Sequence, residues 1–476
     1  MINYALLSDF YELTMANGYY LSGMKDRILY FDLFYRSNPD SGGFAIACGL
    51  APVIEQLQNM HFEDDDIAFL RGKSIFSEDF LQYLKHLRFT GDMWAVPEGT
   101  VVFPNEPLLT VRATAVEAQL IETLLLLLVN HQSLIATKAN RIVRAAAGRT
   151  VLEFGARRAH GKEASLNGAR AAFIAGVPAT SNTLADKLYG IPASGTMAHS
   201  WVQVFDNEYQ AFATYCSLYP NSTSLLVDTY SVLRSGVPNA IKAFKDAGIT
   251  KGSIRLDSGD IAYLSSRARA MLDEAGLEDI KIVASNSLDE GIIREINAQG
   301  GKVDIYGVGE RLITAKSDPV FGGVYKLVAV EDEFGNIVPK IKISENISKI
   351  TTPHFKKIYR LYDRATMKAE ADLLTIYDEE PDFSKPFEIF DPDFPWKRKI
   401  LGDITARELL VPIFKGGELV YDVPSIEESK DYCSREVESI WDEVKRFENP
   451  HNYYVDLSQR LWDEKQHMLT EERKKD

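Results

Sequence analysis

The pattern of apolar and polar positions changes along the chain, and each stretch predicts a different kind of structure. Residues 27–36 (RILYFDLFYR) form an extended apolar run, and residues 93–111 place β-branched residues between Pro and Gly. Runs of this kind are typical of strands joined by tight turns, and short helical patterns lie between them. We therefore predict an N-terminal α+β domain over residues 1–115, completed by part of residues 320–400.

The longest helical pattern covers residues 116–147, where Leu120, Leu124 and Leu128 recur on one helix face. It predicts a helix that links the first domain to the next. At the other end of the chain, residues 400–476 are rich in charge and are predicted to form a C-terminal helical extension.

Short β-rich runs alternate with helical runs between residues 148 and 320. The predicted strands are 150–154, 178–181, 193–197, 225–230, 253–256, 280–285 and 303–306. Strands that alternate with helices favour a parallel sheet with right-handed crossovers. Seven strands fall short of a complete eightfold barrel. The predicted fold class is therefore α/β, with an irregular seven-stranded (β/α) barrel beside the N-terminal α+β domain.

Polar residues or glycines follow all of these strands. They include Arg157, Arg158, Ser181, Asn182, His199, Ser200, Asp228, Thr229, Arg255, Asp257, Asn286, Gly307 and Gly309. In a barrel the carboxyl ends of the strands face one mouth. A surface turn explains any one of these residues, but seven strand ends in register predict a ligand site.

The residue types at this mouth suit a phosphorylated sugar. Arg157 and Arg158 supply positive charge, and Gly307 and Gly309 let backbone N–H groups approach a phosphate. The Gly-Val-Gly run lacks the Walker and dinucleotide-binding patterns. The turn at residues 255–260 (RLDSGD) places a guanidinium beside carboxylates, although its Ser and last Asp are equally explained by a helix cap.

His199 is the least common residue type among these strand ends. At a ligand mouth it suits a general base, a ligand contact or a phosphoacceptor, and spacing leaves the three open. Asp228 and Asp257 suit Mg²⁺ or ribose hydroxyls, although no motif identifies a metal site. Phe154 suits stacking on a planar ring, a position that core packing also explains.

Composition narrows the class of protein. The chain has 476 residues and a net charge of −15, which argues against a general nucleic-acid binder. Its three cysteines are far apart, so no disulfide framework is predicted. The first residues lack a signal-peptide pattern, and the most apolar run, 124–129, is too short to span a bilayer. We expect a cytoplasmic protein with no nucleic-acid and no membrane partner.

Two other classes fit part of this pattern. A barrel isomerase or aldolase acting on a phosphosugar would need a Schiff-base lysine or a paired acid and base at a strand end. No lysine stands at any of the seven strand ends. A non-catalytic phosphosugar-binding protein stays open if His199 is only structural.

Several longer motifs, taken in order, resemble the nicotinate phosphoribosyltransferase family. They are DFYELTMANGYY, FDLFYRSNP, GGFAIACGL, EFGARRAHG, GTMAHSW, LLVDTYSV, RLDSGD, VASNSLDE and YGVGERLITAKSDPVFGGVYKLV. Each motif is modest alone, and their order and number make the resemblance specific. It implies a type II phosphoribosyltransferase fold, in which nicotinate and 5-phosphoribosyl 1-pyrophosphate give nicotinate mononucleotide and pyrophosphate.

The resemblance also implies coupling to ATP hydrolysis through a phosphohistidine, with Mg²⁺ as a cofactor, in the salvage route of NAD biosynthesis. By motif, that histidine is His199 and not His160. Tyr11 resembles the aromatic residue that stacks on the pyridine ring from a neighbouring subunit, which implies a homodimer with shared active sites. Phe154 would stack on the opposite face of the ring.

The remaining roles are carried over by motif as well. Catalytic roles fall to His199, Asp228, Asp257 and Arg255. Substrate contacts fall to Tyr11, Phe154, Arg157, Thr180, Ser200, Asn286, Gly307, Gly309, Lys316 and Lys326. Among these, Arg157 would contact the ribose-phosphate region. The two glycines and the two lysines would take the 5′-phosphate and pyrophosphate.

The sister family, nicotinamide phosphoribosyltransferase, is the nearest alternative. It carries an Asp after its Gly-Thr pair, which accepts from the carboxamide N–H₂. Here residues 179–182 (ATSN) match that stretch and hold no acid. A carboxylate there would repel nicotinate, so its absence favours the acid substrate. Residues 225–228 hold one acid where type I phosphoribosyltransferases have two, and Cys433 alone in the C-terminal region predicts no zinc.

Overall fold

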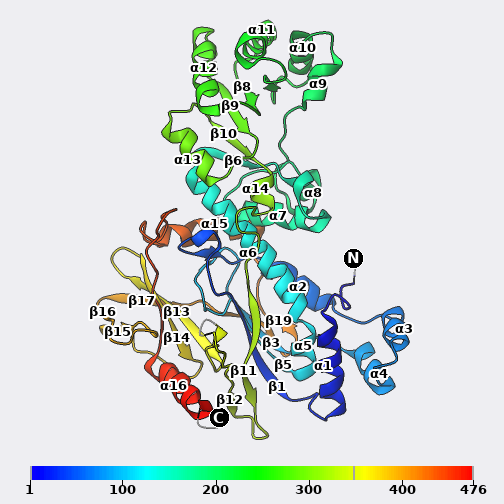
Figure 1. Cartoon of the computed structure of the whole chain (residues 1–476), viewed down its shortest axis with the longest axis vertical. Helices are drawn as coiled ribbons and strands as arrows, with labels where there is room; N and C mark the ends of the chain where they lie inside the picture. The colour runs from blue at the N-terminus through cyan, green and yellow to red at the C-terminus, as the bar shows by residue number, and fades with distance from the viewer. Residues whose placement is uncertain (1–2, 347–348, 474–476) are drawn as a thin grey trace. The chain divides into compact units, whose positions relative to one another are not determined.

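The structure is a computed structural model that describes residues 3–346 and 349–473. It divides into two compact units (Figure 1). Unit 1 comprises Met1–Leu134 and Val320–Asp476, and unit 2 comprises Ile135–Pro319. No helix within the described residues is both long enough and apolar enough to cross a membrane.

Two helices occupy the segment in which one linking helix was expected. They are α5 (Ala115–Leu120) and α6 (Glu122–Ala145), and Ile121 separates them. The Thr114 side chain caps α5 by accepting from the Glu117 N–H. The apolar residues of 116–147 keep a helical spacing across Ile121, so this spacing did not reveal that the helix is interrupted there.

An antiparallel seven-stranded sheet forms the centre of unit 1. Its order is β12 (Ile337–Pro339), β11 (Val324–Glu331), β1 (Ile28–Phe34), β5 (Leu109–Thr114), β3 (Asp92–Ala95), β18 (Val411–Lys415) and β19 (Glu418–Leu419). β1 pairs with β11 and β5, so strands from both ends of the chain meet in one sheet. The N-terminal helices are α1 (Phe10–Leu21), α2 (Leu50–Asn59), α3 (Asp64–Gly72) and α4 (Glu78–His86).

The C-terminal part of unit 1 is not wholly helical as predicted. A second sheet has the order β17 (Ile404–Glu408), β13 (Lys356–Asp363), β14 (Ala369–Ile376) and β20 (Val455–Leu457). The unit also contains two short two-stranded ladders, which pair β15 (Phe387–Phe390) with β16 (Arg398–Leu401) and β2 (Ala45–Ile46) with β4 (Val101–Val102). Its C-terminal helices are α15 (Ile426–Ser439) and α16 (Gln459–Arg473). Within residues 400–476, where only helix was predicted, the structure has β17, β18, β19 and β20. The charge of this stretch obscured these strands because exposed faces of short strands are polar.

Unit 2 is built on a parallel five-stranded sheet. Its order is β6 (Thr150–Glu153), β10 (Ile305–Val308), β9 (Ile280–Ser285), β8 (Gly252–Leu256) and β7 (Ser224–Leu226). The helices are α7 (Lys162–Ile174), α8 (Thr183–Tyr189), α9 (His199–Val204), α10 (Glu208–Leu218), α11 (Val237–Asp246), α12 (Ile261–Glu274), α13 (Glu290–Ala298) and α14 (Glu310–Ile313). The α/β class and the parallel strands are confirmed.

The predicted strands 178–181 and 193–197 are reduced to single bridges. Thr180 pairs in parallel with Glu153 of β6 on one side and with Ala193 on the other. Pro178 and Pro192 precede these contacts and have no N–H to donate, which keeps the pairing short. β7 does not pair with the Ala193 segment in the described part of the chain, so a closed seven-stranded barrel is not shown.

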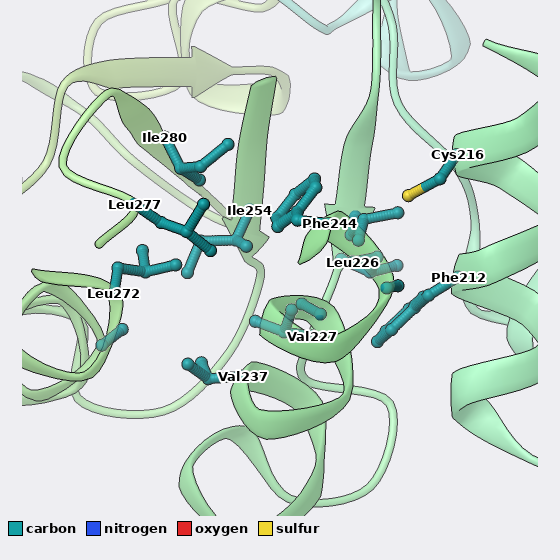
Figure 2. Packing of buried hydrophobic residues seen from close by; sticks show 14 of the residues in the cluster. Phe212, Cys216, Leu226, Val227, Val237, Phe244, Ile254, Leu272, Leu277 and Ile280 are labelled. Carbon is teal, nitrogen blue, oxygen red and sulfur yellow. The ribbon is translucent and has the colours of Figure 1, made fainter. Parts of the chain in front are cut away.

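A buried apolar cluster fixes the strands that carry the polar strand ends. In Figure 2, Leu226 and Ile254 of β7 and β8 lie among side chains from the flanking helices, including Phe244 of α11 and Leu272 of α12. Ile254 and Leu256 are fully buried, so the alternation along β8 turns Arg255 to the other face of the sheet.

Candidate active site

A cavity of about 630 Å³ lies at the carboxyl ends of β6, β7 and β8. Its lining includes Phe154, Arg157, Ser181, residues 195–200, Leu226, Arg255 and Asp257. Residues from several of the predicted strand ends therefore line one cavity in unit 2, whereas Asp228, Gly307 and Gly309 are not among its lining residues. A second cavity, of about 440 Å³, is lined by residues that follow β8 and β9 and includes Asn286.

Arg255 makes the largest number of polar contacts in this cavity. Its Nε donates to Ser285 Oγ at 2.8 Å, and its Nη1 donates to Thr196 Oγ1 at 2.8 Å. Its Nη2 lies 2.7 Å from Asp257 Oδ1, and Ser285 Oγ donates to that same carboxylate oxygen. The guanidinium plane is thus fixed by three partners before any ligand binds.

His199 begins α9 and stands between two polar groups. Its Nδ1 lies 3.1 Å from Thr229 Oγ1, and its Nε2 lies 4.0 Å from Asp257 Oδ2. The imidazole is 41% exposed, so it is both oriented and open to the cavity. The contact with Thr229 orients the ring through Nδ1, and Nε2 faces the Asp257 carboxylate at more than hydrogen-bond distance.

Asp228 lies behind the β8 turn. Its Oδ2 accepts from the Asp257 N–H at 3.2 Å and from Ser258 Oγ at 2.6 Å. Its Oδ1 is shielded from solvent and has no hydrogen-bond partner. Asp228 therefore fixes the backbone from which Asp257 projects and keeps one carboxylate oxygen uncommitted.

Phe154 forms the aromatic wall of the cavity. Its ring covers Gly307, where an added Cβ would lie 2.5 Å from Phe154 Cδ2, so only glycine fits beneath the ring. The Arg255 guanidinium carbon lies 5.9 Å from the ring centroid, within cation–π range. The Phe154 ring thus lines the cavity between Gly307 and a fixed positive charge.

The other predicted contact residues of unit 2 differ in position. Arg157 and Ser200 are exposed and line the cavity. Thr180 is buried and its hydroxyl binds Glu153, so it does not reach the cavity wall. Gly309 precedes α14, and Lys316 Nζ lies 2.6 Å from Glu310 Oε1 at an exposed position.

The predicted contact residues of unit 1 form a local cluster of their own. Tyr11 on α1 is 46% exposed. Partial burial and, to a smaller extent, the nearby Glu122 carboxylate raise the pKa of its phenol, so the side chain stays neutral. Lys326 on β11 lies 3.7 Å from Glu122 Oε1 and donates to the Tyr325 carbonyl. Glu12 is buried beside them.

The donor set at the cavity is compatible with Mg²⁺ and does not form a closed metal cage. No group of three or more His, Cys, Asp or Glu side chains is arranged to hold a metal among residues 3–346 and 349–473. Mg²⁺ typically binds one or two carboxylates together with water and substrate phosphates. Asp257 Oδ2, which faces His199, supplies one such carboxylate oxygen at the cavity. Asp228 Oδ1 is shielded from solvent, and Asp228 is not among the residues that line the cavity.

Comparison with known families accounts for nearly the whole chain. Residues 6–130 match the nicotinate phosphoribosyltransferase (NAPRTase) N-terminal domain, residues 150–360 match the NAPRTase family and residues 355–465 match the NAPRTase C-terminal domain. The chain belongs to the nicotinate phosphoribosyltransferase family.

Individual relatives show the same relationship to this family. The nicotinate phosphoribosyltransferase of Bacillus subtilis is 44% identical over 469 residues, which cover 98% of this chain and 95% of that protein. A Mycobacterium tuberculosis protein described as nicotinate phosphoribosyltransferase pncB2 is 39% identical over 96% of this chain and 92% of its own length. The crystal structure of human nicotinic acid phosphoribosyltransferase superposes with a TM-score of 0.84 and 28% identity, covering 97% of this chain and 100% of that chain.

Sequence reasoning missed one buried acid in this member of the nicotinate phosphoribosyltransferase family. Glu153, directly before Phe154, is 1% exposed, and its carboxylate accepts from Thr180 Oγ1 and from the Gly155 N–H. Its signal is a charged residue that ends an otherwise apolar strand, in the sequence TVLEF. Such a residue needs buried partners, because burying an unpaired carboxylate is costly.

Proposed function

We propose that this chain joins nicotinate to 5-phosphoribosyl 1-pyrophosphate and releases nicotinate mononucleotide and pyrophosphate, as a step of the salvage route of NAD biosynthesis in the cytoplasm. The observation that carries the proposal is the set Phe154, Arg255, Asp257 and His199 around one cavity, in a chain 44% identical to a protein named for this activity.

The cavity supplies what displacement at an anomeric carbon requires. The transition state resembles an oxocarbenium ion, and negative charge develops on the departing pyrophosphate. In the proposed mechanism Phe154 stacks on the pyridine ring and aligns its nitrogen with the ribose carbon. Arg157 and Arg255 supply positive charge near the phosphate groups, and Asp257 supplies an acceptor for ribose hydroxyls. Bound Mg²⁺ would be held by Asp228 and Asp257 and would neutralise pyrophosphate charge.

His199 is proposed to couple this reaction to ATP hydrolysis. The lone pair of the unprotonated imidazole nitrogen attacks the γ-phosphorus of ATP, the bond from that phosphorus to the β-phosphate oxygen breaks, and ADP leaves. Water later cleaves the nitrogen–phosphorus bond and yields inorganic phosphate. The support is the orientation of the imidazole between Thr229 and Asp257 together with its exposure to the cavity.

Specificity for the acid over the amide is part of the proposal. Ser181 lines the cavity and belongs to the stretch 179–182. By the resemblance described above, the nicotinamide enzymes carry an acid in this stretch. A neutral hydroxyl there does not repel the nicotinate carboxylate. We also propose that the strand array of unit 2 forms the wall of an irregular barrel, and that the active protein is a homodimer in which Tyr11 reaches the partner's cavity.

Phosphate transfer from γ-labelled ATP tests the coupling. The purified chain is expected to take up an acid-labile phosphate in the presence of Mg²⁺, and ATP is expected to increase nicotinate mononucleotide formation. His199→Ala should lose both effects, whereas His160→Ala, which changes an exposed residue outside the cavity lining, should keep both. Full ATP stimulation in the His199→Ala protein would show that the coupling proposal is wrong.

A further inference from the structure

Glu153 joins the end of β6 to the 178–181 segment, next to the cavity-lining residues Phe154 and Ser181. Its own backbone N–H donates to the Ala179 carbonyl at 3.0 Å, and its carbonyl accepts from the Ser181 N–H at 2.8 Å. Its side chain then adds a second link, because Oε2 accepts from Thr180 Oγ1 at 2.5 Å. The end of β6 and the 178–181 segment are thus tied through both backbone and side chain.

The same carboxylate also fixes the turn that follows Phe154. Glu153 Oε1 accepts from the Gly155 N–H, and the Phe154 N–H donates to the Val308 carbonyl at 2.8 Å. Both peptide groups that flank the Phe154 Cα are therefore held. Because peptide groups are planar, holding both fixes the direction of the Phe154 Cα–Cβ bond. From this bond the ring lies against Gly307.

The geometry explains why glycine follows Phe154. An added Cβ at Gly155 would lie 2.8 Å from Glu153 Oε1 and 2.6 Å from the Ile313 Cβ. Any larger residue would push the carboxylate away from the N–H that it accepts from. The three residues of Glu-Phe-Gly therefore act together. Glu153 is the acceptor, Phe154 carries the ring, and Gly155 has no side chain that would keep the acceptor from its N–H.

Burial makes the Glu153 contacts strong and their loss costly. The side chain is almost fully buried, and burial raises the pKa of its carboxyl while the bonds from Thr180 and Gly155 lower it. Thr180 Oγ1 itself accepts from the Asn182 N–H at 3.0 Å, so its own hydrogen is directed to Glu153. Removing the acceptor would leave buried donors without a partner.

We propose that Glu153 is a positioning residue for nicotinate, because its carboxylate, held by Gly155 and Thr180, sets the pose of the Phe154 ring. This inference rests on the proposed function, since it assigns Phe154 to the pyridine ring. A misplaced ring weakens substrate and transition state alike, so the KM for nicotinate rises more than kcat falls.

The test compares variants that remove each half of the link. Glu153→Met fills the same space without an acceptor, and Thr180→Val removes the hydroxyl with little change of shape. Both are expected to raise the KM for nicotinate by about fivefold or more, with kcat and the KM for 5-phosphoribosyl 1-pyrophosphate within about threefold of wild type. Thr180→Ser restores a hydroxyl and should recover most of the loss.

Glu208→Met is the matched control. Glu208 is 4% exposed in the same unit, accepts from Asn239 Nδ2 at 3.0 Å, and lies outside the cavity lining. It should lower the melting temperature without raising the KM for nicotinate. The inference is overturned if Glu208→Met raises that KM equally, or if both substrates' KM values rise together in Thr180→Val. Should Glu153→Met fail to fold, the Thr180→Val and Thr180→Ser pair decides.

The same assays separate this inference from the proposed function. A wild-type protein that forms no nicotinate mononucleotide contradicts the proposed function, and the positioning inference falls with it. A wild-type protein that is active, with variants that keep its KM for nicotinate, contradicts the positioning role of Glu153 alone.

Discussion

Arg255 shows at the residue scale how a strand's alternation prepares a binding group. Ile254 and Leu256 are held in the apolar cluster, which leaves the guanidinium on the opposite face with Ser285, Thr196 and Asp257 as partners. A planar fork with these fixed partners needs little reorganisation when an anionic ligand arrives. The positive charge at this cavity is therefore built into the strand.

Replacement of Arg255 by Lys tests this preorganisation. A single ammonium group cannot meet three partners in one plane, so kcat/KM is expected to fall roughly 10- to 100-fold, the loss typical of one or two charged hydrogen bonds. Steady-state assays of nicotinate mononucleotide formation measure it. Arg269→Lys is the control, because Arg269 contacts Asp273, Leu277 and Ile280 outside the cavity. Equal losses in both variants would show that Arg255 acts only through stability.

At the scale of elements, buried ion pairs join parts of the chain that are distant in sequence. Arg360 of β13 is fully buried and contacts both oxygens of Asp372 on β14, at 2.9 Å and 2.6 Å. It also donates to Glu436 of α15 at 3.1 Å and to the Val101 carbonyl at 2.8 Å. One side chain thus connects the second sheet, the C-terminal helix and β4.

Removing Arg360 should be costly to stability. Arg360→Met leaves Asp372 buried without its cationic partner and leaves Glu436 with Arg407 alone, which is expected to lower the free energy of unfolding by about 3–5 kcal/mol. Arg364→Met, which breaks an exposed pair with Asp403, should cost about 1 kcal/mol or less. Denaturant unfolding of both variants measures the difference. Equal destabilisation would contradict the role assigned to the Arg360 network.

Glu12 gives the junction of α1 and α6 a predicted pH dependence. Its Oε1 accepts from the Thr123 N–H and Oγ1, its Oε2 has no hydrogen-bond partner, and burial raises its pKa from 4.5 to about 7. The folded protein keeps a proton that the unfolded chain releases near pH 4.5. This contribution to the free energy of unfolding is therefore lost as pH rises from about 4.5 through about 7.

Glu12→Gln should remove that pH dependence. The amide oxygen keeps both bonds from Thr123, and the amide nitrogen replaces the unpartnered oxygen without carrying charge. Calorimetry at about pH 5.5 and about pH 8 should give a smaller fall in melting temperature for the variant than for wild type. The same fall in both proteins would mean that Glu12 does not titrate in this range.

The sequence predicted elements where periodicity is strong and failed where pairing is short. The strand at 253–256 shows alternating buried and half-buried positions, and the strand at 280–285 is a nearly continuous buried run, so both patterns are typical of strands. The segments 178–181 and 193–197 form only bridges, since prolines remove donors that a ladder would need. Thr180 was assigned to the substrate because sequence shows that a side chain is polar but not which way it points.

The whole molecule places the predicted functional residues in two units. His199, Arg255 and Phe154 belong to unit 2, whereas Tyr11 and Lys326 belong to unit 1. The order of the family motifs related the residues of unit 1 and those of unit 2 to one reaction. Periodicity and composition carry no information about the distance between these residues. The family comparison covers both units, so both belong to one member of the nicotinate phosphoribosyltransferase family.

Subunit mixing tests whether Tyr11 acts in a neighbouring subunit. Tyr11→Ala and His199→Ala proteins should each be nearly inactive in the ATP-stimulated assay. After mixing and exchange of subunits, half of the dimers are mixed, and each of these has one site with both residues intact. Recovery of about a quarter of wild-type activity is therefore expected. No recovery, in a mixture shown to exchange subunits, would place Tyr11 and His199 in the same subunit's site.

The central claim is that the cavity around Phe154 and Arg255 joins a pyridine carboxylic acid to a phosphoribosyl group. The most direct measurement supplies the purified protein with 5-phosphoribosyl 1-pyrophosphate, Mg²⁺, ATP and equal amounts of nicotinate and nicotinamide, and separates the products by chromatography. We predict nicotinate mononucleotide with stoichiometric pyrophosphate and almost no nicotinamide mononucleotide. Nicotinamide mononucleotide as the main product, or no mononucleotide at all, would contradict the account.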